Sequence, residues 1–171
     1  MLKLFCPDLY IENIYKLDLQ QIKKKSIKGI LIDLDNTLLP WDSMLIEEKL
    51  KNWTKHCINE GFSLCIISNN KYNRIKYCSE HLEIPAVFGS FKPCKSAFKK
   101  GMDILGTQPE QTAVLGDQIF TDIFGAKRMG LYAILVKPIS NRELYWTRMM
   151  RILERRLLKI LASKKLISLN R

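Results

Sequence analysis

Four short motifs combine acidic, hydroxyl and lysine side chains next to apolar runs or predicted helices. They are, in order along the chain, Asp33-Leu-Asp35, Ser68-Asn69, Lys92-Pro93 and Gly116-Asp117 with Asp122. A carboxylate at the end of a buried apolar run is costly unless it is paired or binds a metal. Carboxylate oxygens are ligands that Mg²⁺ prefers, and this ion usually keeps water and phosphate oxygens as well. These residue types therefore indicate a site for a divalent cation and a phosphate group.

The same residue types suit phosphoryl transfer. One carboxylate can attack phosphorus as a nucleophile, and a second can move the proton. A lysine and a hydroxyl can hold the phosphate, and a metal ion offsets the repulsion between the attacking carboxylate and a dianionic substrate. The motifs thus predict chemistry at phosphorus if the fold brings them together.

The elements that must position these motifs alternate between short apolar runs and longer amphipathic segments. This alternation predicts a parallel sheet with helices on both faces. The expected strands are 29–33, 63–68, 86–88, 112–115 and 132–136, and the expected helices are 46–59, 72–82, 96–105 and 121–129, with a further helix from about residue 142. Glycines at 61, 106 and 130 are placed to end helices. Ligands of such sheets bind at the carboxyl ends of the strands, where the motifs lie.

Composition narrows the class of protein. The chain has 171 residues and a formal net charge of +11, which suits one globular domain, 1–171, with a polyanionic partner. Five cysteines without a Cys-x-x-Cys pair exclude a disulfide framework and a structural zinc site, so we expect buried, reduced thiols. The N-terminal apolar run is too short for a signal peptide, and no run approaches the ~20 residues of a membrane span. We expect a cytoplasmic protein.

Taken in order, the four motifs resemble those of the haloacid dehalogenase (HAD) superfamily, over residues 29–136. The resemblance implies a Rossmann-like parallel sheet and Mg²⁺-dependent hydrolysis of phosphomonoesters through an aspartyl-phosphate. Caps and turns on an ordinary Rossmann-like fold would explain each motif separately, but not the ordered set.

The resemblance also implies catalytic and substrate-binding roles. Asp33 is the expected nucleophile, and Asp35 the acid and base that protonates the leaving alcohol and activates water. Thr37 is expected to order the catalytic loop. The residues expected to bind or neutralise the phosphoryl group are Thr37, Ser68, Asn69 and Lys92. Lys95 is the alternative to Lys92 for the catalytic lysine.

The expected Mg²⁺ ligands, again by resemblance, are Asp33, Asp35 through its backbone carbonyl, Asp117 and Asp122. Asp122 has an alternative role, which is to orient Lys92. The intervals between the first three motifs hold about one helix each, so we expect no cap domain and an open site that suits a large or surface-bound substrate. Trp41 is expected to pack over the edge of the sheet.

Residues 28–41 and 116–126 resemble the YqeG-type phosphatases of HAD subfamily IIIA, which are similar to mitochondrial phosphatidylglycerophosphate phosphatases. This likeness implies an anionic phospholipid headgroup as the substrate and phosphatidylglycerol as the product. A soluble sugar phosphate or nucleotide is the alternative substrate. A non-catalytic module that binds RNA is a third hypothesis, but no aromatic stacking platform supports it, and we expect no nucleic-acid partner.

The C-terminal segment 142–171 is predicted to form a basic amphipathic helix. Nine of the 28 Lys and Arg residues lie at 141–171, where Asp and Glu number two, which gives 9 − 2 = +7. One interpretation is a helix packed on the sheet with solvated basic residues, including Arg151. The other is a helix at the inner face of an anionic membrane, where each Lys or Arg near the surface contributes about 1 kcal/mol.

Overall fold

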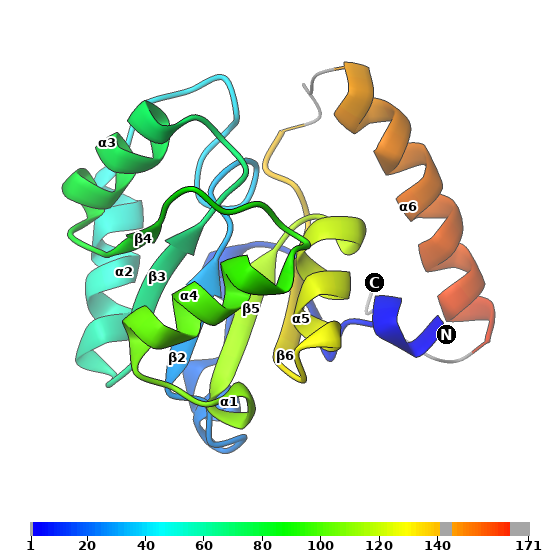
Figure 1. Cartoon of the computed structure of the whole chain (residues 1–171), viewed down its shortest axis with the longest axis horizontal. Helices are drawn as coiled ribbons and strands as arrows, with labels where there is room; N and C mark the ends of the chain where they lie inside the picture. Colours follow the sequence, from blue (N-terminus) through cyan, green and yellow to red (C-terminus); the bar gives the residue numbers. More distant parts are fainter. Residues whose placement is uncertain (1, 141–144, 165–171) are drawn as a thin grey trace.

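The computed structural model describes residues 2–140 and 145–164, with side chains from residue 149 onward in the second range. Its centre is a six-stranded parallel sheet (Figure 1). The strands are β1 (Leu9–Ile11), β2 (Gly29–Ile32), β3 (Ser63–Ile67), β4 (Ala86–Val87), β5 (Thr112–Gly116) and β6 (Tyr132–Val136).

The strand order is β1-β6-β5-β2-β3-β4, so β2 lies between β3 and β5. The chain first extends the sheet on one side of β2 and then crosses over to extend it on the other. Register is continuous across the centre, because Ile32 pairs with Ile66 of β3 and with Leu115 of β5. In open parallel sheets, this reversal of strand order creates a crevice at the carboxyl ends. The motif that follows β2 therefore lies at the expected ligand site.

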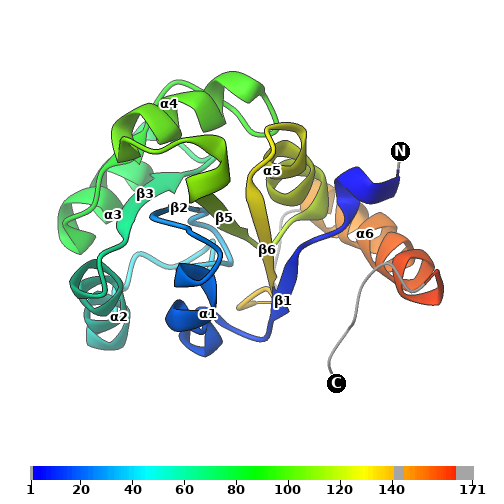
Figure 2. The ribbon, with the colours of Figure 1, turned by 90° about the horizontal axis from the view of Figure 1, so that it is seen from below.

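Alternating residues of the buried strands point to two apolar layers. Ile30 and Ile32 contribute to the layer covered by α1 (Leu19–Lys23), α2 (Glu48–Asn59) and α3 (Tyr72–Leu82). Leu31 contributes to the opposite layer, covered by α4 (Lys95–Leu105) and α5 (Phe124–Arg128). Figure 2 shows these two helical layers on opposite faces of the sheet. This is the predicted α/β architecture, and the described residues include no cap domain.

The structure also corrects the expected elements. Strand β1 was not expected, because its three residues form a short edge strand beside β6. The predicted helix 121–129 is a π-helical turn, η4 (Ile119–Ile123), followed by α5. Short 3-10 turns were also missed; they are η1 (Leu2–Phe5), η2 (Ile14–Lys16) and η3 (Pro109–Gln111). The glycines at 61, 106 and 130 have positive φ just after α2, α4 and α5, as predicted.

The expected C-terminal helix is α6 (Tyr145–Ser163), which lies beyond the β1–β6 edge of the sheet, near the N-terminus (Figures 1 and 2). The rest of segment 142–171 lies outside the described residues. Among the described helices, none combines the length and apolar character needed to cross a membrane.

The expectation of uniformly buried thiols is wrong in part. The thiols of Cys57, Cys65 and Cys78 are buried, whereas Cys6 is half-buried and Cys94 is exposed. Burial raises the pKa of Cys57 and of Cys65 to about 12. All five thiols are free, in agreement with the absence of a disulfide framework.

Candidate active site

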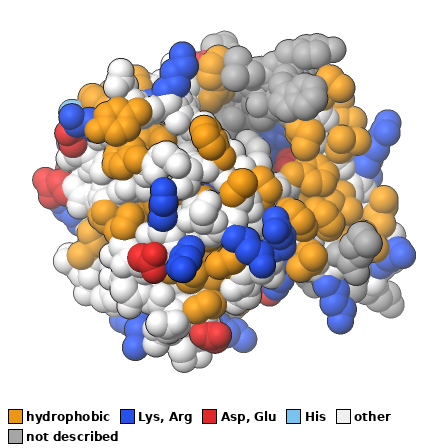
Figure 3. All heavy atoms as spheres, in the orientation of Figure 1, with side chains coloured by type: hydrophobic (Ala, Val, Ile, Leu, Met, Phe, Trp, Pro, Cys, Tyr) orange, Lys and Arg blue, Asp and Glu red, His pale blue; other side chains and the backbone are white. Residues whose placement is uncertain are grey.

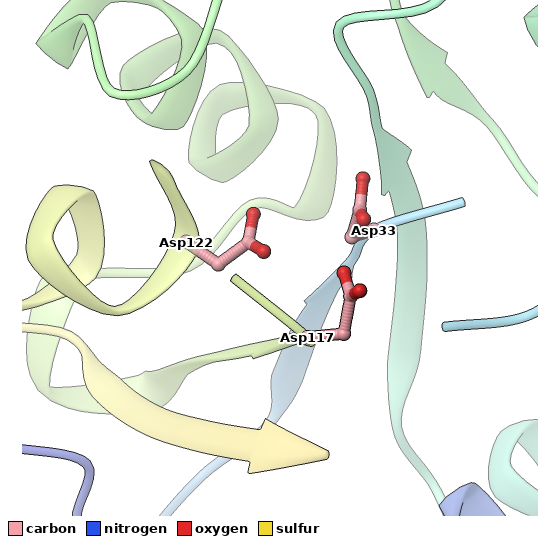
Figure 4. A group of neighbouring side chains, drawn as sticks. All are labelled: Asp33, Asp117 and Asp122. Carbon is pink, nitrogen blue, oxygen red and sulfur yellow. The ribbon is translucent and has the colours of Figure 1, made fainter. Parts of the chain in front are cut away.

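Three aspartates meet where the central strands end. Asp33 directly follows β2, Asp117 directly follows β5, and Asp122 lies on the η4 turn (Figure 4). Their carboxylates point toward one another, and each offers an oxygen within 4.8 Å of the others. All three are nearly inaccessible to solvent, with exposed fractions of 4%, 2% and 0%. The sequence motifs therefore converge as expected.

Gly116 makes room for one of these carboxylates. A Cβ atom at this position would lie 2.3 Å from Cγ of Asp122, which is closer than any tolerated contact. The φ angle of Gly116 is not positive, unlike those of Gly61, Gly106 and Gly130. Glycine is thus required by the close approach of Asp122 rather than by a tight turn. The Asp122 side chain is held there because its Oδ2 accepts a 3.0 Å hydrogen bond from the backbone N–H of Gln118.

Lys92 is the buried cation of the cluster. Its ammonium group forms ion pairs with Asp33 and, at 2.7 Å, with Oδ1 of Asp122. Burial alone would lower the pKa of Lys92, but the charges of Asp122 and Asp33 outweigh burial and raise this pKa. Lys95 is exposed and forms no ion pair with the described residues. The geometry therefore supports Lys92 rather than Lys95, and it gives Asp122 the orienting contact that the sequence left as an alternative.

Asn69 connects the second and third motifs. Its amide donates to the carbonyl of Lys92 at 3.0 Å and accepts from the backbone N–H of Lys92 at 2.7 Å. The side chain expected to bind phosphate is therefore occupied in positioning Lys92. The neighbouring hydroxyl of Ser68 donates to Oδ2 of Asp35 at 3.3 Å.

Residues of α3 and of the loop before it donate hydrogen bonds to the Asp35 carboxylate. Oδ1 of Asp35 accepts from Nε of Arg74 at 2.8 Å, and its Oδ2 accepts from Nδ2 of Asn70 at 2.8 Å. A second guanidinium nitrogen of Arg74 donates to the carbonyl of Pro40, which fixes the loop after β2. Arg74 was not predicted from the sequence; its place two residues into the helix that follows the Ser68 motif was the available signal.

A pocket of about 350 Å³ opens above these side chains. Asp33, Asp35, Ser68, Asn69 and Lys92 line it together with Trp41. Trp41 thus contributes to the pocket wall rather than only packing at the sheet edge.

Thr37 does not line this pocket, and its buried hydroxyl donates to Oδ1 of Asp117 at 3.3 Å. This contact fits the loop-ordering role of Thr37 and not the direct phosphate contact that was also expected.

Arg151 of α6 reaches the same cluster, which the sequence analysis did not predict. Its guanidinium pairs with Oδ2 of Asp117 and donates to the Asp117 carbonyl. It also pairs with Glu154 at 3.0 Å. Oε1 of Glu154 in turn accepts hydrogen bonds from the backbone N–H groups of Ile119 (2.6 Å) and Phe120 (3.3 Å). Arg151 is 8% exposed, so the expectation that it is solvated or faces lipid is wrong.

The charges of the described cluster leave room for a divalent cation. Asp33, Asp117 and Asp122 with Glu154 give −4, and Lys92 with Arg151 gives +2, so the cluster sums to −4 + 2 = −2. Burial raises the pKa of Asp33 well above its usual range despite Lys92 nearby. Burial also raises the pKa of Asp117 to about 6, against the opposing effect of Arg151. A bound Mg²⁺ would balance this charge with hard oxygen ligands. The residues therefore fit the ion.

Comparison with known families matches these same segments. Residues 30–92 match the haloacid dehalogenase-like hydrolase family, and residues 91–141 match the HAD-hydrolase-like family. The two matches meet at Lys92 and together include all four motifs.

Individual relatives extend the likeness to nearly the whole chain. The chain is 36% identical over 162 residues to the "Probable phosphatase YqeG" of Bacillus subtilis, covering 95% of this chain and 94% of that protein. It is 30% identical over 127 residues to the mitochondrial phosphatidylglycerophosphatase GEP4 of Saccharomyces cerevisiae, covering 66% and 68%. Among solved structures, the cobalt-bound deoxy-D-mannose-octulosonate 8-phosphate phosphatase of Haemophilus influenzae superimposes with a TM-score of 0.53 at 16% identity, covering 80% and 90% of the two chains. That likeness concerns the fold.

Proposed function

Because the chain belongs to the haloacid dehalogenase-like hydrolases and is a phosphatase of that family, we propose that it removes the terminal phosphate of phosphatidylglycerophosphate in a Mg²⁺-dependent reaction. The observation that carries the proposal is the convergence of Asp33, Asp117 and Asp122 with Lys92 at the end of β2 and β5. In this proposal, residues 1–171 act as one catalytic domain.

The first half of the reaction forms an aspartyl-phosphate, which is an acyl phosphate on the enzyme. A carboxylate oxygen of Asp33 bonds to phosphorus while the bond from phosphorus to the substrate alcohol breaks, and Asp35 protonates the departing alcohol oxygen. Lys92 faces both Asp33 and the pocket, so its ammonium offsets negative charge on the transferring group. In this proposal the Ser68 hydroxyl, which donates to Asp35 in the structure, donates to a phosphoryl oxygen once the substrate is bound.

In the second half, Asp35 takes a proton from water as that water attacks the aspartyl-phosphate. Phosphate leaves, and the carboxylate of Asp33 is restored. Arg74 and Asn70 hold Asp35 at the pocket throughout, by the contacts described above. Bound Mg²⁺, held by Asp33, the Asp35 carbonyl and Asp117, would neutralise substrate charge and polarise the phosphoryl group. Asp122 keeps Lys92 in place.

Three features support a lipid substrate. The yeast relative is named for phosphatidylglycerophosphate, and the pocket is not covered by a cap within the described residues. The outer side of α6 also exposes about half of each of four large apolar side chains, Met149, Ile152, Leu153 and Ile160. Figure 3 shows hydrophobic and basic side chains together over this part of the surface. We propose that α6 lies against an anionic membrane surface at the cytoplasmic side.

The test measures phosphate release from phosphatidylglycerophosphate in mixed micelles, with Mg²⁺ or with EDTA. We expect turnover by the wild type in Mg²⁺, and background release in EDTA and for Asp33→Asn. Asp42→Asn is the matched control, because Asp42 is an exposed acid on the same loop. Turnover of soluble phosphoesters such as sugar phosphates without any release from the lipid would refute the lipid substrate. An active Asp33→Asn variant would refute the nucleophile.

A further inference from the structure

A second cavity, of about 780 Å³, lies between α6 and the end of β6. This volume is within the range of small-molecule sites. Asp117 and Ile119 line it, whereas Gln118, between them in the chain, lines the active-site pocket. The two hollows therefore lie on either side of the segment 117–119, which carries a candidate metal ligand.

The cavity has an apolar interior and a basic rim. Tyr10, Ile119 and Leu158 contribute apolar surface. Lys137 and Arg155 are exposed lining residues, and neither forms an ion pair with another described residue. Deeper in the wall, Arg151 is paired with both Asp117 and Glu154, so the five charged lining residues sum to +3 − 2 = +1. The charge left for a ligand is therefore positive, which favours an anion attached to an apolar body.

The roof of the cavity is held mainly by polar contacts. The ion pairs and hydrogen bonds of Arg151 and Glu154 connect α6 to the end of β5, while only Leu161 is fully buried among the apolar side chains described on this helix. Ile152 lines the cavity and is also 50% exposed. The cavity is thus continuous with the exposed apolar side of α6, so a ligand inside it can extend outward along that surface.

We propose that this cavity binds the phosphodiester and glycerol backbone of the phospholipid substrate, with Lys137 and Arg155 as ligands of the phosphodiester. The inference rests on the proposed function, because that substrate carries a phosphodiester one glycerol away from the phosphate that is cleaved. The terminal phosphate occupies the pocket at Asp33, and the acyl chains leave past Ile152. Specificity for a lipid then arises because one substrate occupies both hollows, with its glycerol linker crossing the segment between them at Gln118.

A binding experiment tests the site without turnover. Monomeric dihexanoyl-phosphatidylglycerol contains the phosphodiester and short acyl chains but no cleavable phosphate, so its affinity, measured by calorimetry, reports on binding without phosphoryl transfer. We expect Lys137→Gln/Arg155→Gln to weaken binding at least about tenfold. The matched control is Lys99→Gln/Lys100→Gln, which removes two exposed charges of α4 that do not line the cavity, and we expect it to bind as the wild type does. The site would be overturned if the wild type did not bind this lipid, or if both variants lost affinity equally.

A kinetic experiment separates this inference from the proposed function. The ratio of kcat/KM for phosphatidylglycerophosphate to kcat/KM for p-nitrophenyl phosphate should fall at least about tenfold in Lys137→Gln/Arg155→Gln. An unchanged ratio with full lipid turnover would overturn the cavity site and leave the proposed function standing. Wild-type binding of dihexanoyl-phosphatidylglycerol that depends on Lys137 and Arg155, without any lipid turnover, would support the site and overturn the substrate.

Discussion

Replacing Arg151 by methionine should destabilise the protein more than any other single change on the described part of α6. Methionine keeps much of the side-chain volume but leaves the carboxylates of Asp117 and Glu154, which are 2% and 4% exposed, without their cation. Breaking a buried pair in this way costs about 3–5 kcal/mol. Backbone N–H groups still reach Glu154, and Thr37 still donates to Asp117, so we expect the lower end, about 3 kcal/mol.

Urea and thermal unfolding in EDTA, followed by circular dichroism, would measure this loss. A loss of about 3 kcal/mol corresponds to a fall in Tm of roughly 6–12 °C for a chain of this size. Arg156→Met is the control, because Arg156 is exposed on the same helix, and its effect should stay within about 0.5 kcal/mol. Equal effects of the two substitutions would refute the anchoring of α6 through Arg151.

Adding Mg²⁺ extends the experiment. The ion and the guanidinium neutralise the same carboxylate of Asp117, so Mg²⁺ should stabilise Arg151→Met more than it stabilises the wild type. An ion at 100 times its Kd contributes about 2.7 kcal/mol, enough to recover most of the loss. If Mg²⁺ stabilised the wild type more than the variant, Arg151 would be assisting the metal at Asp117, and the charge argument would be wrong.

Three further outcomes follow from the site and its surroundings. Gly116→Ala should displace Asp122, because the new Cβ would lie 2.3 Å from Cγ of Asp122. We expect phosphatase activity at least about 100-fold lower, with the fold retained. Normal activity of this variant would refute the close approach. Burial raises the carboxyl pKa values of Asp33, Asp117 and Glu154, so the folded protein retains protons that the unfolded chain releases. In EDTA, the free energy of unfolding should therefore rise as the pH falls from 7 to 5. A steady decrease of this free energy in urea titrations over the same pH range would contradict these shifts. Thiol labelling at pH 8 should modify Cys94 first, and the three buried cysteines should react only in denaturant; early loss of more than two thiols would contradict the described burial.

The parts of the site that depend on local sequence were predictable. Asp33 and Asp117 follow apolar runs that were expected to be strands of one parallel sheet, so both carboxylates were expected at its carboxyl edge. The structure adds that the two strands are neighbours. Lys92 was preferred over Lys95 as the catalytic lysine, and its burial between Asp33 and Asp122 agrees with that preference.

The parts that depend on non-local packing were not predictable. Arg151 and Glu154 occur in a helical pattern whose periodicity assigned the basic residues to solvent or lipid. Their actual role is set by where α6 docks, and no local signal encodes that position. The three-residue strand β1 was missed for a similar reason, because its pairing with β6 brings together residues 9–11 and 134–136.

The attachment of Asp117 to Arg151 also has a consequence for protein synthesis. Every strand of the sheet is complete once residue 136 has been made, so the core can begin to fold while the C-terminal segment is still in the ribosome. The cation that faces Asp117 arrives only when α6 emerges. A chain released early, for example by a stop codon at position 145, would thus assemble the sheet with Asp117 lacking its guanidinium partner. Completion of the site is in this way coupled to the synthesis of α6.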